Sequence, residues 1–153
     1  MSGRSTLLQD AGIDEPLVER MMAAARAAAD HAYAPYSHFP VGAAVLTASG
    51  EIVSGVNIEN ASSGLTVCGE RVAIFTAAAQ GHRELRAVAV SAPRAAGTTP
   101  CGACRQVINE FKPGGGELVV LIDHGDRIVP HAFSDLLPHA FGPRDLERAA
   151  SPT

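Results

Sequence analysis

The chain has 153 residues, 46% hydrophobic and 18% charged, which is enough to bury the core of one globular domain, and we expect that domain to span residues 1–153. The net charge is −4 and no stretch of Lys and Arg forms the basic patch that would hold a nucleic-acid backbone, so we expect small-molecule or protein partners and no nucleic acid. No apolar run approaches the roughly 20 residues that cross a bilayer, and residues 1–10 lack the basic and apolar regions of a signal peptide, so we expect a cytoplasmic protein without a membrane partner.

The hydrophobic pattern predicts helices that alternate with short strands. The first helix, over 14–32, has Asp14 as its N-cap and Pro16 in its first turn, and Pro35 ends it near Tyr33. In chain order there follow strands over 41–47 and 52–57, a helix over 67–79, a strand over 85–92, a helix over 101–111, strands over 117–122 and 127–129, and two short helices near the C-terminus, the first over 134–137. This order predicts an α/β fold in which a mixed sheet carries helices on both faces. Ligands in such sheets bind at strand ends and helix starts, and two of the predicted helices start with cysteines.

The three cysteines are spaced for metal binding. They are too few, and odd in number, for a disulfide framework, although each alone could be a small buried side chain. Cys101 and Cys104 lie three residues apart at a helix start, so both sulfurs can face one point, and Cys68 starts the preceding helix. Free N–H groups at both helix starts favour thiolates. Because zinc takes sulfur ligands tetrahedrally, the pattern predicts a zinc site with three protein ligands.

Three protein ligands leave the fourth zinc position open, which is typical of a catalytic site. None of the six histidines lies at ligand spacing from a cysteine; they are His31, His38, His82, His124, His131 and His139. Glu70 lies two residues after Cys68 in the first turn of the same helix, where an acid alone would be unremarkable. Beside an open zinc position, however, it can take a proton from water and return it. Arg71 is placed to donate hydrogen bonds to a thiolate and so to offset its charge.

The sequence also resembles a known family. A Cys-x-Glu motif followed by Pro-Cys-x-x-Cys is the arrangement of the zinc deaminases. Five segments resemble the small homotetrameric cytidine deaminases: APYSHFPVGAA at 34–44, NIENA at 57–61, CGER at 68–71, PCGACRQ at 100–106 and LLPHAFG at 136–142. Together, in this order, they cover most of residues 33–142.

The resemblance implies a three-layer α/β/α sandwich with a five-stranded mixed sheet. It implies one zinc ion per subunit, held by Cys68, Cys101 and Cys104, and a homotetramer whose pocket is shared between subunits. The implied reaction is hydrolysis of the 4-amino group of cytidine, 2′-deoxycytidine or a modified cytosine nucleoside. The products would be the uridine compound and ammonia, as in pyrimidine salvage.

The resemblance also implies roles for single residues. Glu70 would take a proton from the attacking water, protonate N3 of the ring and help the amine to leave. Asn57 and Glu59 match the pair that contacts the ribose 3′-hydroxyl, although alone they would be ordinary turn residues at a strand end. Phe39 matches an aromatic side chain that packs on the base, and Phe141 matches one donated by a neighbouring subunit. Without the resemblance, both aromatic residues would be assigned to the core.

Two positions depart from the family pattern. Family members usually carry tyrosine where this chain has Ser63, near the sugar, and alanine where it has Gly69, between the ligand and the acid. Both changes reduce side-chain volume around the expected pocket. We therefore include Gly69 among the substrate-binding residues and expect the pocket to tolerate modified or larger nucleosides.

Three other functions compete with cytidine deamination. A deaminase for a cytosine-containing antibiotic such as blasticidin S would share the zinc motifs but lack the Asn-x-Glu-Asn segment, which is present at 57–60. An editor of polynucleotides is opposed by the acidic net charge and by the lack of stretches that combine aromatic and basic residues. The sequence leaves open a non-enzymatic zinc module that acts through protein contacts.

Overall fold

The computed structural model of the chain describes residues 3–150, without the side chains of residues 4 and 5. A five-stranded sheet lies at its centre, with the strand order β2-β1-β3-β4-β5. β3 and β4 pair in parallel and the other neighbours pair antiparallel, so the sheet is mixed, as predicted. The strands are β1 (Gly42–Thr47), β2 (Ile52–Val56), β3 (Leu85–Ser91), β4 (Val119–Asp123) and β5 (Ile128–Ala132).

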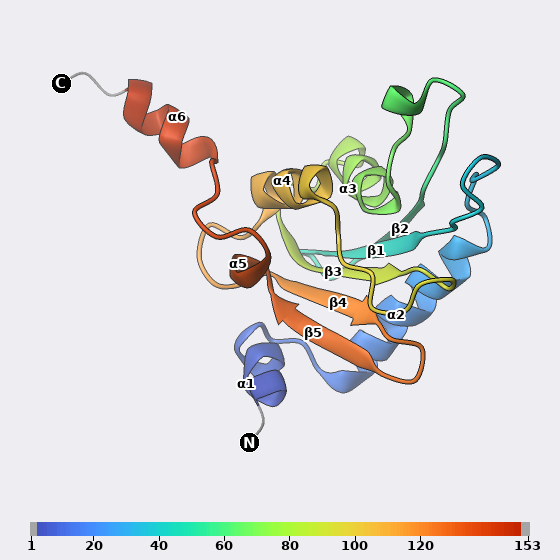
Figure 1. Cartoon of the computed structure of the whole chain (residues 1–153). Coiled ribbons are helices and arrows are strands. Elements are labelled where there is room, and N and C mark those ends of the chain that lie inside the picture. The colour runs from blue at the N-terminus through green and yellow to red at the C-terminus, as the bar shows by residue number, and fades with distance from the viewer. Residues whose placement is uncertain (1–2, 151–153) are drawn as a thin grey trace.

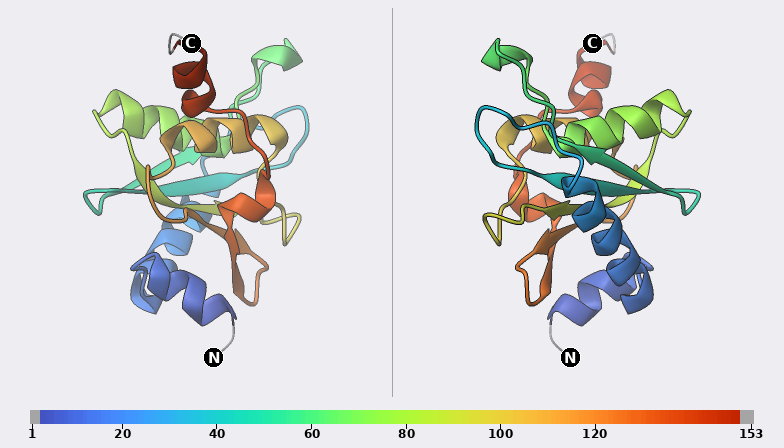
Figure 2. Two further views of the ribbon diagram at one scale, coloured as in Figure 1. Left: turned by 90° about the vertical axis from the view of Figure 1, so that its left-hand side faces the viewer. Right: turned by 90° about the vertical axis from the view of Figure 1, so that its right-hand side faces the viewer.

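Helices cover both faces of the sheet and form two outer layers (Figures 1 and 2). One face carries α1 (Gly3–Asp10) and α2 (Glu15–Ala29), and the other carries α3 (Gly69–Ala79) and α4 (Gly102–Phe111). The shorter elements are the 3-10 helix η1 (Ser63–Leu65), α5 (Phe133–Leu136) and α6 (Pro143–Ala150). α6 projects away from the body of the molecule (Figure 1) and has no buried residue. The predicted α/β/α sandwich is thereby confirmed, while both ends of the expected domain, 1–2 and 151–153, lie outside the described residues.

Each face of the sheet has its own hydrophobic core. Along β1, Ala43 and Val45 belong to the core under α3 and α4, while Ala44 and Leu46 belong to the core under α2. All four side chains are fully buried, as expected for a central strand that is covered on both faces. Burial of this apolar surface holds the two helical layers against the sheet.

The first long helix ends earlier than predicted, at Ala29 rather than near Tyr33. The N–H of Tyr33 donates to the carbonyl oxygen of Asn57 at 3.0 Å, so the chain must leave the helix before this residue. The start of the helix is as predicted, because Asp14 accepts a hydrogen bond from the N–H of Leu17 at 2.9 Å. No helix within residues 3–150 combines the length and apolar character needed to cross a membrane.

The path of the chain brings the starts of α3 and α4 together. β1 runs antiparallel to both β2 and β3, so β2 and β3 point the same way. α3 follows β2, α4 follows β3, and both helices return across the same face of the sheet (Figure 1). Their first residues therefore lie at the carboxyl edge of these strands, the edge at which α/β sheets bind ligands.

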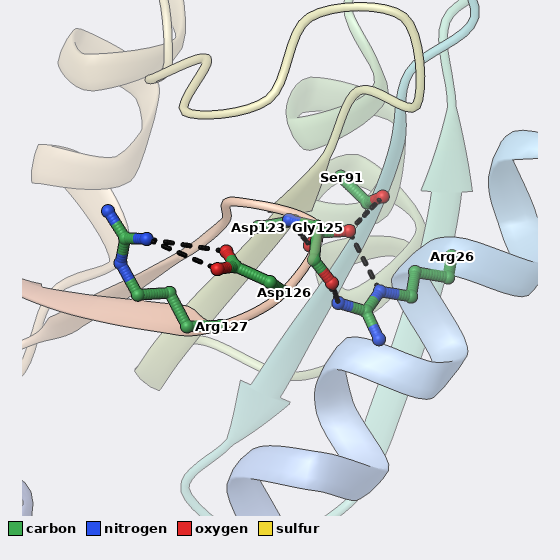
Figure 3. A network of polar contacts seen from close by, with 6 residues as sticks. All are labelled: Arg26, Ser91, Asp123, Gly125, Asp126 and Arg127. Carbon is green, nitrogen blue, oxygen red and sulfur yellow. Dashed lines mark hydrogen bonds and ion pairs between the residues drawn. The ribbon is translucent and has the colours of Figure 1, made fainter.

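A buried carboxylate ties α2 to the end of β4 (Figure 3). Asp123 accepts hydrogen bonds from Nε and Nη2 of Arg26 at 2.8 and 2.7 Å, from Oγ of Ser91 at 2.7 Å and from the N–H of Gly125 at 2.8 Å. The bonds from Arg26 are the largest reason that the pKa of Asp123 lies well below its ordinary value, and Gly125 and Ser91 lower this pKa further, against the effect of burial. Because the folded state favours the ionised form, this carboxylate stabilises the fold wherever it is charged.

Asp123→Asn should lower the free energy of unfolding at neutral pH by about 1–3 kcal/mol. This range is smaller than for a fully buried ion pair, because the Arg26 side chain is 43% exposed. A depressed folded-state pKa contributes stability above the unfolded value of about 3.9, and this stability is lost as the pH falls through the folded-state value. In urea unfolding, the difference between wild type and variant should therefore be constant at neutral pH and shrink below about pH 4.

The control for this experiment is Asp126→Asn, in the same turn. It breaks an exposed ion pair with Arg127, at 3.3 Å, and should cost less than about 0.5 kcal/mol. A stability difference for Asp123→Asn that stayed unchanged down to about pH 3 would contradict the assigned electrostatic origin.

Candidate functional site

Three cysteine sulfurs converge where α3 and α4 begin. Cys68 is the N-cap of α3, Cys101 is the N-cap of α4, and Cys104 lies in the first turn of α4. The Sγ atoms of Cys68 and Cys101 are 3.8 Å apart, those of Cys101 and Cys104 are 3.5 Å apart, and all three lie within 4.8 Å of one another. The structure thus brings together the three side chains that the sequence selected as metal ligands.

The spacing of the sulfurs fits zinc. Three sulfurs at about 2.3 Å from a tetrahedral zinc ion would be about 3.8 Å apart, close to the separations in this cluster. Within residues 3–150, no other cysteine, histidine, aspartate or glutamate belongs to a group with this spacing. A tetrahedral ion held here would keep one position free of protein ligands.

The charges around the cluster favour a cation. The pKa of Cys68 is lowered to about 5, chiefly by a hydrogen bond with Cys104 and further by Arg71 and Cys101. Cys104 shows the opposite behaviour, because the neighbouring Cys68 thiolate and burial raise the pKa of its thiol. The three sulfurs cannot all ionise side by side unless a positive charge joins them, and a divalent metal ion supplies that charge.

Arg71 lies against the cluster from the first turn of α3. Its Nη2 donates to the Sγ of Cys68 at 3.3 Å, in the geometry expected of a group that offsets thiolate charge. Its Nε is buried and has no hydrogen-bond partner within the described part of the chain. A buried donor of this kind normally has a partner, so the guanidinium retains capacity for a further negative or polar group at the site.

Glu70 is a buried carboxyl group beside the sulfurs. It is only 4% exposed, and its burial is the largest of the effects that raise its pKa. The Cys68 thiolate raises this pKa further, while a hydrogen bond from the backbone N–H of Glu70 itself opposes the rise. A carboxyl group that binds protons more tightly than usual, next to a candidate metal site, is suited to general acid–base chemistry.

The side chain of Asn57 is bound to backbone near the site. Its Oδ1 accepts from the N–H of Val41 and its Nδ2 donates to the carbonyl of Phe39, both at 2.8 Å. This amide therefore fixes the segment that leads into β1 and carries Phe39. One N–H and one lone pair of the amide remain for another partner.

Glu59 also acts on the segment that carries Phe39. Its carboxylate accepts from the N–H of Ser37 at 3.2 Å and from the Ser37 hydroxyl, whose oxygen accepts in turn from the N–H of Phe39 at 3.1 Å. The intervening residue, His38, has a φ of 54°, a conformation that is uncommon outside glycine. Phe39 is half-buried, so part of this side chain lies outside the core.

Phe141 lies on the surface and not in the core. It is 59% exposed, while its carbonyl oxygen accepts from Nε2 of Gln106 at 3.0 Å and from Nδ2 of Asn109 at 2.9 Å. Two side chains of α4 thus hold the backbone at Phe141, and the aromatic ring remains available to a neighbouring molecule.

Gly69 is buried where α3 meets the strand ends. A Cβ at this position would lie 3.1 Å from the carbonyl oxygen of Val41, 3.3 Å from the nitrogen of Asn57 and 3.4 Å from the carbonyl carbon of Val56. Backbone atoms therefore occupy the space next to the missing methyl group. The glycine allows close packing of the helix start, and its lack of a methyl group does not by itself enlarge a pocket.

Sequence reasoning missed Arg105, which holds the segment before the two cysteines of α4. Its Nε donates to the carbonyl of Pro100 and its Nη1 to the carbonyl of Leu136, both at 2.7 Å, and its Nη2 donates to Oγ1 of Thr99 at 3.0 Å. Its place in the PCGACRQ segment was the available signal, but its partners become apparent only in the fold.

The chain is similar to cytidine deaminases of known sequence and structure. Residues 16–121 match the family model of the cytidine and deoxycytidylate deaminase zinc-binding region. The chain is 45% identical over 133 residues to a cytidine deaminase of Sporosarcina psychrophila, covering 87% of this chain and 97% of that protein. It is 47% identical over 121 residues to a cytidine deaminase of Mycobacterium tuberculosis, covering 79% and 86%. The crystal structure of cytidine deaminase from Burkholderia pseudomallei superposes with a TM-score of 0.74 at 44% identity, covering 80% of this chain and 98% of that one.

Arg71→Ala should raise the pKa of the Cys68 thiol above about 5, because the thiolate loses a charged donor. The change can be followed in metal-free protein by pH titration of the ultraviolet absorbance of thiolates. Arg83→Ala is the control, since Arg83 follows the same helix but donates to the backbone carbonyls of Ala78 and His82. An unchanged Cys68 titration in Arg71→Ala would show that the guanidinium does not stabilise the thiolate.

Proposed function

Because this chain belongs to the cytidine and deoxycytidylate deaminase family, we propose that it is a zinc-dependent hydrolase that deaminates cytidine, 2′-deoxycytidine or a modified cytosine nucleoside. The products are the uridine compound and ammonia. The observation that carries this proposal is the cluster of Cys68, Cys101 and Cys104 with the buried carboxyl group of Glu70 beside it.

The three cysteines would hold the metal and Glu70 would move the protons. Zinc, when bound, supplies a Lewis acid with one open position and lowers the pKa of water toward neutrality. The Glu70 carboxylate accepts a proton from the water that attacks C4 of the ring, and it delivers a proton to N3. It then assists the departure of the 4-amino group as ammonia. The raised pKa of Glu70 suits both steps, since the carboxyl group must hold the proton between them.

Thiolate charge has to be offset for this chemistry. Three thiolates donate more negative charge than three imidazoles would, which works against the acidity of the water. Arg71 and the N-termini of α3 and α4 oppose this effect, because each places positive charge or N–H dipoles toward the sulfurs. Arg71 is therefore proposed as a supporting residue that does not contact substrate.

Phe39, Asn57 and Glu59 form the proposed nucleoside-binding side of the site. The ring of Phe39 would pack on the base, and the free hydrogen-bonding capacity of Asn57 and Glu59 would serve the ribose 3′-hydroxyl. Recognition of a ribose by these residues favours cytidine over a cytosine-containing antibiotic. Gly69 would contribute its backbone to the floor of the site, since its neighbours there are backbone atoms.

We further propose a homotetramer in which Phe141 completes the pocket of a neighbouring subunit. Phe141, Leu65 and Phe75 are 59%, 66% and 49% exposed, so a neighbouring subunit that covered them would gain free energy from apolar burial. A single domain over residues 1–153, a location in the cytoplasm and a role in pyrimidine salvage complete the proposal.

Glu70→Gln should lower kcat by about 10²- to 10⁴-fold, because the amide cannot transfer a proton. The ultraviolet spectrum of cytidine follows the reaction, and metal analysis should show unchanged zinc content. Glu110→Gln, an exposed position on α4, is the matched control and should retain full activity. Turnover close to wild type in Glu70→Gln would refute the assignment of the acid–base residue.

A panel of cytidine, 2′-deoxycytidine, free cytosine and blasticidin S tests the substrate class with the same assay. We expect nucleosides with an unmodified sugar hydroxyl at the 3′ position to react fastest. Faster turnover of blasticidin S would favour the antibiotic deaminase, and stoichiometric zinc without any reaction would favour a non-enzymatic zinc module.

Co-expression tests the shared pocket. Phe141→Ala and Glu70→Gln should each be weakly active alone, but a mixed assembly should regain activity, since a pocket with an intact Glu70 can receive Phe141 from the other subunit. Sedimentation should give the mass of four subunits for the wild type. If the mixed assembly showed only the summed activity of its parents, Phe141 would not serve a neighbouring pocket.

A further inference from the structure

We propose that Asp123 is a positioning residue for the metal centre, which it supports by holding the loop 92–100 between β3 and Cys101. The side chain of Asp123 fixes the strand end from which this loop departs, and its backbone carbonyl fixes the middle of the loop. The inference rests on the proposed function in one respect only: it takes the cluster of Cys68, Cys101 and Cys104 to be the site that binds zinc.

The carboxylate of Asp123 anchors the beginning of the loop. Asp123 is 9% exposed, and each of its oxygens accepts two hydrogen bonds (Figure 3). One of the four donors is Oγ of Ser91, which is the last residue of β3 and is 1% exposed. The buried hydrogen bond of 2.7 Å between them fixes the strand end at which loop 92–100 begins. Arg26 and Gly125 hold the same carboxylate from α2 and from the turn after β4.

The backbone at Asp123 anchors the middle of the loop. The N–H of Gly97 donates to the carbonyl oxygen of Asp123 at 2.8 Å. Gly97 has a φ of +83°, and a Cβ there would lie 3.0 Å from Cε1 of His124, so the loop lies directly on the residue after Asp123. The position of His124 depends on the turn that the Asp123 carboxylate closes through Gly125. Side chain and backbone of one residue therefore fix two points of the loop.

The remainder of the loop is tied to α4 and to the nucleoside side. Arg105 binds Thr99 and Pro100, so the last loop residues move with the helix that carries Cys101 and Cys104. Earlier in the loop, Nη1 of Arg94 donates to the carbonyl of His38 at 2.7 Å. His38 is the residue in the uncommon left-handed conformation that precedes the proposed base-packing side chain. A displacement of this loop would disturb the metal ligands and the base site together.

The chemistry explains why a carboxylate is needed at position 123. Asparagine has the same shape, but its NH₂ group cannot accept hydrogen bonds, so two of the four donors would face another donor. A loop with few buried contacts would then sample other arrangements, and metal ligands tolerate little displacement. Loss of such outer support typically changes metal binding by about 10- to 100-fold.

The test uses zinc-loaded protein and a chromogenic chelator. We expect Asp123→Asn to release zinc at least about tenfold faster than wild type under conditions where both are folded, and Ser91→Ala to show a smaller change in the same direction. Cobalt(II) bound to the metal-free proteins should give altered thiolate charge-transfer bands in Asp123→Asn. Arg94→Ala should instead raise KM for cytidine with an unchanged rate of zinc release.

Glu51→Gln is the control, because it changes a polar contact of 2.8 Å with Nε2 of His82, next to the edge strand β2 and away from loop 92–100. It should alter neither zinc release nor the cobalt spectrum. Wild-type zinc release and an unchanged cobalt spectrum in Asp123→Asn, even with lower stability, would overturn the proposal. Zinc-loaded wild type that is inactive on every nucleoside would overturn the proposed function alone, whereas a wild type that binds no zinc would overturn both.

Discussion

The parallel direction of β2 and β3 is the constraint on which the site depends. Because α3 and α4 return across the same face, their N-termini meet at one edge of the sheet, and the caps of the two helices become neighbours although they lie far apart in the sequence. The cysteines at those caps meet there, together with Cys104 from the first turn of α4. The burial of β1 and β3 between two helical layers keeps the helices, and therefore the sulfurs, in place.

The arrangement also concentrates charge that the fold alone does not neutralise. Three thiols and a buried carboxyl group lie together at the starts of α3 and α4, and the opposed pKa shifts of Cys68 and Cys104 reflect that conflict. Arg71 and two helix N-termini offset part of the negative charge, and a divalent ion accounts for the rest. Burial is the main reason that the pKa of Glu70 is raised, and the Cys68 thiolate raises this pKa further, so the cysteine cluster also affects the residue proposed for proton transfer.

The sequence predicted the fold class and the clustering of the three cysteines because both leave local patterns in the chain. Apolar strands, an N-cap at Asp14 and cysteines three residues apart are visible without a structure. The helix α1 was not predicted, since its buried face is small and Leu8 is the buried apolar side chain among those described in this helix. Hydrogen bonds that support the site were also hidden, because Arg26 and Asp123 are 97 residues apart and Arg105 and Leu136 are 31 apart. The backbone contacts of Asn57 likewise depend on how β1 and β2 pair.

In the proposed site, three thiolates hold zinc and leave one position for the reaction. X-ray absorption at the zinc edge of the purified wild-type protein tests it most directly, because this measurement reports the atoms bound to the metal without requiring a substrate. We expect three sulfur ligands at about 2.3 Å and one lighter ligand, oxygen or nitrogen. A shell of four sulfurs, or a shell with fewer than three, would contradict it.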